Sequence, residues 1–135
     1  MATVPLITDE SVGDPRVAAV FSDIRATRGT DNINNFWRAL ANDPPLLEAT
    51  WARLKMVMGP GALNPLTKEL LYLAVSMANS CDYCIHSHTT AARAKGMTDA
   101  QHGELLAILA MASQTNALAT ALAVPVDQAF NADPN

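Results

Sequence analysis

Two cysteines and a histidine stand close together in the sequence, at spacings that suit thiol chemistry. Cys81, Cys84 and His88 follow one another at intervals of three and four residues. On a helix, at about 100° per residue, these intervals put the three side chains on one ridge within roughly 60° of arc. His86 falls on nearly the opposite side of the same helix. The spacing therefore indicates that His88, and not His86, serves the cysteines.

The cysteine pair is expected to be redox-active or metal-binding rather than structural. The chain has two cysteines, and a bond between residues three apart closes a loop too small to constrain an unfolded chain much. In a cytoplasmic protein such a pair favours catalysis or metal binding. At the start of a helix, free N–H groups and the helix dipole favour a thiolate at Cys81, whereas the charge of Asp82 opposes it. His88 can accept a proton or supply a positive charge.

A carboxylate in the preceding helix is the fourth candidate. Glu69 lies at the edge of an apolar stripe, in a helix that is apolar on other sides too and is therefore expected to run through the core. The residue is either a buried acid–base group with a raised pKa or a helix-start carboxylate favoured by the dipole. Antiparallel packing across Asn79 and Ser80 would bring Glu69 toward the cysteine ridge, with a water completing a proton relay. The apolar residues of this helix are Leu66, Leu70, Leu71, Leu73, Ala74, Val75 and Met77.

Helical signals dominate the chain and strand signals are nearly absent, so the expected fold class is all-α with about six or seven helices. Ser80 is the expected N-cap of the cysteine helix, and Gly96 the residue that ends it. Thr98 and Gln101 have capping-box spacing for the next helix. Pro125 must end or kink the last helix. The expected helical segments are 15–29, 36–41, 46–58, 65–78, 81–95, 98–109 and 115–130.

A chain of 135 residues fits one domain. Within it we expect an N-terminal arm and first helix over residues 1–33, a core over 34–112, and a C-terminal helix and tail over 113–135, frayed at 131–135. The aromatic residues of the first half fall at helical core spacing and are expected to pack inside. These residues are Phe21, Phe36, Trp37 and Trp51.

Composition narrows the class of protein. Half of the residues are hydrophobic and 16% are charged, so apolar surface should remain outside a chain this short, and a homo-oligomer is expected to cover it. The net charge of −4, without a Lys/Arg stripe, argues against nucleic-acid binding. The sequence has no signal-peptide pattern and no apolar run of about 20 residues. A soluble cytoplasmic protein that binds no membrane is therefore expected.

The four candidate residues together form a recognisable pattern, E-x11-C-x2-C-x3-H, from Glu69 to His88. This pattern resembles the signature of AhpD-like alkylhydroperoxidases in the carboxymuconolactone decarboxylase superfamily. The surrounding segments Asn64–Leu70, Cys81–His88 and Ala94–Thr98 are similar to the same superfamily. The resemblance covers roughly residues 34–112, and four matching residues across two helices are far more specific than a lone C-x-x-C.

The resemblance implies an AhpD-like helical fold that assembles into dimers, trimers or hexamers. It also implies reduction of hydrogen peroxide or organic hydroperoxides by thiols, with no metal or flavin cofactor. Cys84 would attack the peroxide, Cys81 would resolve the product as a disulfide, and Glu69 and His88 would relay protons. Electrons would return from a dithiol donor, such as a thioredoxin-like or lipoyl-bearing protein. The family's best-known peroxidase has a histidine just before its second cysteine, where this chain has Tyr83, a poor base near neutral pH.

Several alternatives remain open on the sequence. The cysteines could be two small buried residues, or they could bind zinc with His88 and a fourth ligand from Glu69 or water. Haem attachment requires histidine directly after the second cysteine, where Ile85 stands. A carbon-acid enzyme of the decarboxylase type would use Glu69 and His88 without the thiols. A non-enzymatic redox-sensing module would use the disulfide without turnover.

Overall fold

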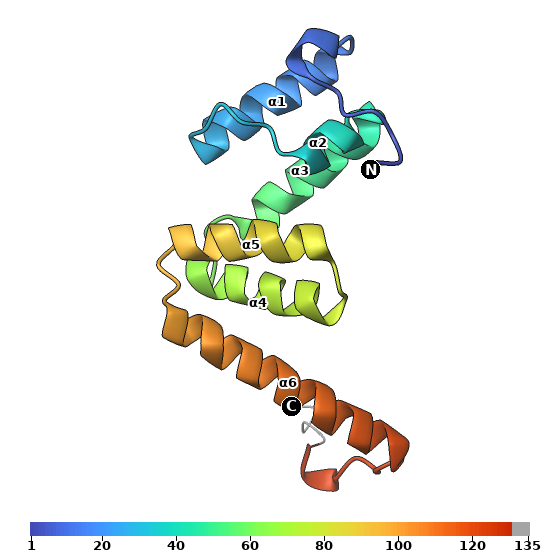
Figure 1. Ribbon diagram of the computed structural model, residues 1–135, viewed down its shortest axis with the longest axis vertical. Helices are drawn as coiled ribbons and strands as arrows, with labels where there is room; N and C mark the ends of the chain where they lie inside the picture. The colour runs from blue at the N-terminus through green and yellow to red at the C-terminus, as the bar shows by residue number, and fades with distance from the viewer. Residues whose placement is uncertain (131–135) are drawn as a thin grey trace. The chain divides into compact units, whose positions relative to one another are not determined.

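The computed structural model describes residues 1–130, and this part of the chain is all helical, with six α-helices, two short 3₁₀ turns and no strand (Figure 1). The expected fold class is thereby confirmed, while the tail expected over 131–135 lies outside the described residues. No helix in this part is long and apolar enough to cross a membrane. The elements are η1 (Asp9–Ser11), α1 (Pro15–Arg28), α2 (Asn35–Leu40), α3 (Pro44–Met58), α4 (Pro65–Ala78), α5 (Asp82–Ala94), α6 (Asp99–Ala121) and η2 (Gln128–Phe130).

The first of two compact units covers residues 1–59 and is built from α1, α2 and α3. Trp37 and Trp51 meet edge to face in its core, with ring centroids 5.2 Å apart, and Phe21 is buried beside them. The expectation that Phe36 is also internal is wrong, because that side chain is 43% exposed. Neighbouring residues on a helix point about 100° apart, so a short helix that buries Trp37 turns Phe36 outward.

The second unit begins at Pro60 and positions all the candidate residues. Helices α4 and α5 form a hairpin, and α6 contacts α4 (Figure 1). Its core consists of Leu73, Ala92 and Met97, with partly buried apolar neighbours around them. Leu71 and Val75 are 54% and 59% exposed, so the expectation that α4 is buried on all sides is wrong. The stripe through Leu73 faces the neighbouring helices, and the opposite face of α4 is open.

Local capping fixes the two ends of the α4–α5 hairpin. Asn64 caps α4 by accepting a hydrogen bond from the backbone N–H of Thr67 at 2.8 Å, as the sequence predicts. Cys81, and not Ser80, is the N-cap of α5. Ser80 has φ of 54°, in the left-handed region, whereas an N-cap residue needs an extended backbone. Gly96, with φ of 94°, follows the end of α5 and confirms its predicted role.

Helix α6 replaces the two helices that the sequence suggested after residue 98. The Thr98–Gln101 capping box is present at its start, as predicted. The helix then continues to Ala121, because the residues between 110 and 115 include no glycine or proline to break it. The separate helix expected over 115–130 is therefore wrong: its first part extends α6, and Pro125 lies beyond the end of that helix. No residue of α6 is fully buried.

Candidate redox site

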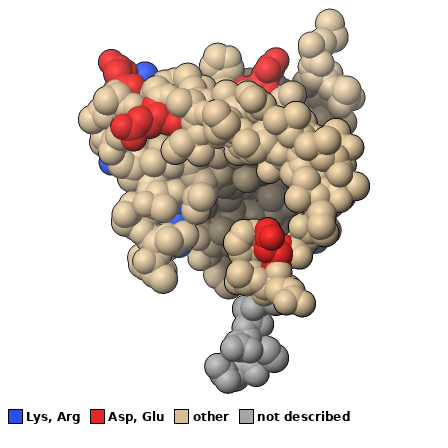
Figure 2. Space-filling model, turned by 90° about the horizontal axis from the view of Figure 1, so that it is seen from below, with Lys and Arg blue, Asp and Glu red and all other residues tan. Residues whose placement is uncertain are grey.

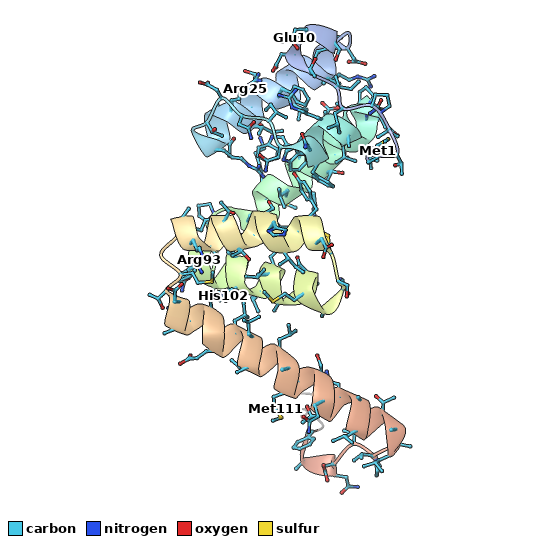
Figure 3. The ribbon with its side chains drawn as sticks, viewed as in Figure 1. Met1, Glu10, Arg25, Arg93, His102 and Met111 are labelled. Carbon is cyan, nitrogen blue, oxygen red and sulfur yellow. A yellow bond between two sulfur atoms is a disulfide. The ribbon has the colours of Figure 1, made fainter. Side chains whose placement is uncertain are left out.

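A disulfide joins Cys81 and Cys84 at the N-terminal end of α5, where Figure 3 draws it as a yellow bond. Cys81 is the N-cap residue and Cys84 lies in the first turn, which brings their Cα atoms to 5.3 Å. Both residues are half-buried. These are the only two cysteines of the chain. The two cysteines are therefore bonded to each other at the start of a helix, and are not two unrelated buried residues.

His88 lies one turn beyond Cys84 on α5, and α4 brings a carboxylate to it. Nδ1 of His88 and Oε2 of Glu69 are 2.7 Å apart, and the Glu69 side chain is only 5% exposed. With the carboxylate ionised, Nδ1–H donates and Oε2 accepts. This contact fixes the tautomer that leaves Nε2 as the basic nitrogen of the ring. The structure thus joins Glu69 to the cysteine ridge through His88.

Lys95 forms an ion pair with the other oxygen of Glu69, Oε1. Burial raises the pKa of the Glu69 carboxyl, but the hydrogen bonds from His88 and Lys95, and the positive charge of Lys95, outweigh this effect. The pKa of Glu69 consequently lies below its usual value. The raised pKa considered from the sequence is therefore wrong: Glu69 is a buried carboxylate that remains ionised.

Two neighbours of His88 and Glu69 were missed by the sequence reasoning. Tyr72 of α4 stacks on the His88 ring, with centroids 3.7 Å apart and planes 20° from parallel. Lys95 is the other. Spacing offers a signal for each, because Lys95 comes seven residues after His88 and Tyr72 three after Glu69, which are same-face intervals on a helix. The site therefore consists of the disulfide and a packed cluster of four polar side chains.

The remaining histidines lie apart from this cluster. His86 is exposed on α5, in line with its predicted position on the other side of the helix. His102 lies at the start of α6 (Figure 3), and its Nε2 is buried without a hydrogen-bond partner among residues 1–130. The zinc arrangement considered above is not formed, since both sulfurs are in the disulfide and His88 contacts Glu69. In the described part of the chain no three His, Cys, Asp or Glu side chains are grouped to hold a metal.

Comparison with known proteins identifies the family of the chain. A sequence model of the carboxymuconolactone decarboxylase family matches residues 44–127. The crystal structure of the alkylhydroperoxidase AhpD core from Rhodospirillum rubrum is similar, with a TM-score of 0.95 and 64% sequence identity, over 98% of this chain and 99% of that one.

Two further relatives carry related names. Alkyl hydroperoxide reductase AhpD of Solibacter usitatus is 36% identical over 100 residues, which are 73% of this chain and 54% of that protein. An alkyl hydroperoxide reductase of Mycobacterium tuberculosis is 31% identical over 101 residues, 75% of this chain and 29% of that protein. The chain thus spans about half the length of the first relative and under a third of the second.

The fold is all-helical over residues 1–130, and its candidate site combines a C-x-x-C disulfide with a buried His–Glu pair. The chain belongs to the carboxymuconolactone decarboxylase family and is AhpD-like.

Proposed function

We propose that the protein is a thiol-dependent peroxidase that reduces hydrogen peroxide or small organic hydroperoxides. The observation that carries this proposal is the Cys81–Cys84 disulfide at the start of α5, one turn before His88 and its buried partner Glu69. A redox couple with an adjacent proton carrier is the minimum that peroxide reduction by thiols needs. The alkylhydroperoxidase names of the relatives support the same activity.

The proposed reaction has two steps in the reduced protein. The thiolate of Cys84 attacks the terminal peroxide oxygen, the O–O bond breaks, and the departing alkoxide takes a proton to leave as an alcohol. Cys84 is then a sulfenic acid. The thiolate of Cys81 attacks the sulfenic sulfur, the S–O bond breaks, and water leaves as the disulfide forms. Two electrons pass from the two thiols to the peroxide.

Protons move through His88 in this proposal, and Glu69 supports His88 from α4. Because Nδ1–H of His88 donates to Glu69, Nε2 is the nitrogen that can take the proton of a thiol and later return it to the leaving alkoxide. Glu69 stays ionised and stabilises the imidazolium that forms in between. Tyr83, which precedes Cys84, adds a hydrogen-bond donor near the thiols rather than a second base.

The cycle closes when a dithiol donor reduces the disulfide by thiol–disulfide exchange. We propose a thioredoxin-like or lipoyl-bearing protein, since each presents two thiols on an accessible arm or surface. The cysteines lie at the N-terminal end of α5 and are only half-buried, so we expect such a donor to reach a sulfur. Donors of this kind act in reducing compartments, so we place the protein in the cytoplasm.

We further propose that the protein works as a homo-oligomer through α6. Apolar side chains of this helix are exposed, among them Leu106, Ile108, Met111 and Leu118. Charged side chains are sparse on the face shown in Figure 2. An exposed apolar helix of this length is typical of a subunit interface, and two copies of one chain can cover it symmetrically.

A carbon-acid enzyme of the decarboxylase type is the second candidate. The cluster of Glu69, His88 and Lys95 favours it, because a buried acid–base pair does not need the thiols to move a proton. Activity of that kind would survive replacement of both cysteines. A redox sensor, the third reading, would form the disulfide once and show no turnover with a dithiol donor.

The test is the reaction of the pre-reduced protein with one equivalent of cumene hydroperoxide, followed by free-thiol titration, intact mass and peroxide assay. We expect the loss of two thiols and two hydrogen masses for each peroxide consumed. Oxidation should be at least 10-fold faster than that of free cysteine, as an activated thiolate requires. Thiols that react no faster than free cysteine would overturn the peroxidase proposal.

A further inference from the structure

Two lysines with equal exposure differ in the carboxylates they pair with. Lys55 and Lys95 each have a 38% exposed side chain and each forms one ion pair. The partner of Lys55 is Asp23, 44% exposed, whereas the partner of Lys95 is Glu69, 5% exposed. An ion pair between exposed groups contributes little, but a buried carboxylate without a counter-charge is strongly disfavoured. The charge of Lys95 therefore stabilises its partner carboxylate more than the charge of Lys55 does.

We propose that Lys95 is a positioning residue that keeps Glu69 ionised with its Oε2 directed at His88 Nδ1, so that His88 Nε2 remains free to accept a proton. The consequence for catalysis rests on the proposed function, whereas the effect on His88 does not. Lys95 reaches Oε1 of Glu69, and His88 occupies Oε2 at 2.7 Å. Each carboxylate oxygen thus has its own donor, and the direction of both contacts is fixed.

The end of α5 holds Lys95 in place. Lys95 is the C-cap residue, and its backbone N–H lies 3.2 Å from the carbonyl oxygen of Ala91 and 3.1 Å from that of Ala92. Gly96 follows with φ of 94°, which turns the chain away from the helix. Lysine at this position also complements the helix dipole, so a purely structural role is the alternative that the experiment has to separate.

Few other charges bear on this cluster. From α5, the groups that act on the Glu69 carboxylate are His88 and Lys95. From α4, Tyr72 stacks on the His88 ring. From α6, Asp99 is bound by Arg93 at 2.8 Å, and the first two turns of that helix also carry His102 and Glu104. Lys95 is thus the cation that balances Glu69.

Removal of the Lys95 charge should change the protonation of the Glu69–His88 pair in a defined direction. With Lys95 absent, the negative charge of Glu69 is balanced by His88 alone. The Glu69–His88 pair then takes up a proton at higher pH, and His88 becomes an imidazolium that cannot act as a base. The charge of Lys95 therefore opposes uptake of an extra proton by the Glu69–His88 pair and leaves His88 able to receive the thiol proton.

The experiment is a pH titration of the reduced protein with ¹⁵N-labelled histidine, followed by NMR. The chain has three histidines, and His86→Gln and His102→Gln assign their signals. In Lys95→Met the pH midpoint of the His88 signals should rise by about one unit or more, the size expected for loss of a nearby opposite charge. Lys95→Arg should keep the wild-type midpoint. The matched control Lys55→Met makes the same change in net charge and should also keep it.

A midpoint that stays in place in Lys95→Met, or moves equally in Lys55→Met, would overturn the proposal. Should Lys95→Met fail to fold, the ¹⁵N shifts of His88 in the wild type can still contradict the proposal. Above the midpoint its ¹⁵N shifts must show Nδ1 protonated and Nε2 unprotonated, and the reverse tautomer would overturn the proposal. A wild type inert to peroxide would refute the proposed function and leave this result standing. If the wild type reacts with peroxide but the His88 midpoint is unchanged in Lys95→Met, only the role of Lys95 is refuted.

Discussion

Neutralising the buried carboxylate is the change with the clearest expected cost. Glu69→Gln keeps the shape of the side chain, which is 5% exposed, but removes its charge. The carboxylate accepts hydrogen bonds on both oxygens, from His88 and from Lys95. An amide has one acceptor oxygen and one NH₂ group, so it can satisfy only one of these two donors.

The magnitude follows from these contacts. One charge-assisted hydrogen bond is lost, worth about 1.5–3 kcal/mol, and the other becomes a neutral acceptor. Removing one partner of a fully buried ion pair costs about 3–5 kcal/mol, but Lys95 is 38% exposed and can be hydrated once released. We therefore expect a loss of about 2 kcal/mol in the free energy of unfolding near neutral pH, at the lower end of these ranges.

Urea unfolding followed by circular dichroism measures this loss, with Glu104→Gln on the exposed face of α6 as the control. The folded-state pKa of Glu69 is depressed, so its ionisation stabilises the fold above the unfolded pKa. That contribution is lost as pH falls through the lower, folded-state pKa. The wild type and Glu69→Gln should accordingly converge in stability at acidic pH. A difference below about 0.5 kcal/mol near neutral pH, as for a surface substitution, would show that these contacts of Glu69 do not stabilise the fold.

Three further predictions test packing, backbone and assembly. Leu73→Ala should cost about 2–5 kcal/mol of unfolding free energy, and Leu71→Ala on the open face of α4 under about 1 kcal/mol, in urea titrations. Gly96→Ala should lower the melting temperature, because φ of 94° strains any L side chain. Gly103→Ala within α6 should raise the melting temperature, because glycine is unfavourable inside a helix and the added methyl group has open space. Changes of the opposite sign would contradict these roles of the two glycines. Ile108→Asp should reduce the molar mass found by light scattering after size-exclusion chromatography, and an unchanged mass would exclude this part of α6 from the interface.

Local sequence signals predicted the elements that carry the site. Asn64 and Pro65 marked the start of α4, and Gly96 marked the end of α5, because capping depends on residues a few positions apart. The turn between them was placed one residue wrong: Ser80 has the chemistry of a cap, but its left-handed backbone leaves that place to Cys81. The chemistry of a residue does not determine its backbone angles.

The contacts between helices were harder to predict than the helices. The ridge of Cys81, Cys84 and His88 followed from spacing on α5 alone. A raised pKa was one of two interpretations of Glu69, because its burial could be estimated from the sequence while its partner Lys95 could not. Spacing puts Lys95 on the same helix face as His88, but its pairing with Glu69 depends on how α4 and α5 dock. Periodicity within one helix carries no information about the register of its neighbour.

In the proposed reaction, Cys84 attacks the peroxide and Cys81 resolves the product. The most direct measurement is mass spectrometry of reduced Cys81→Ser treated with cumene hydroperoxide in the presence of dimedone, a sulfenic-acid trap. Since this variant lacks the resolving thiol, we expect a dimedone adduct on Cys84, formed as fast as the wild type consumes peroxide. Cys84→Ser should form none. An adduct on Cys81 in Cys84→Ser, with Cys84 unmodified in Cys81→Ser, would contradict the assignment.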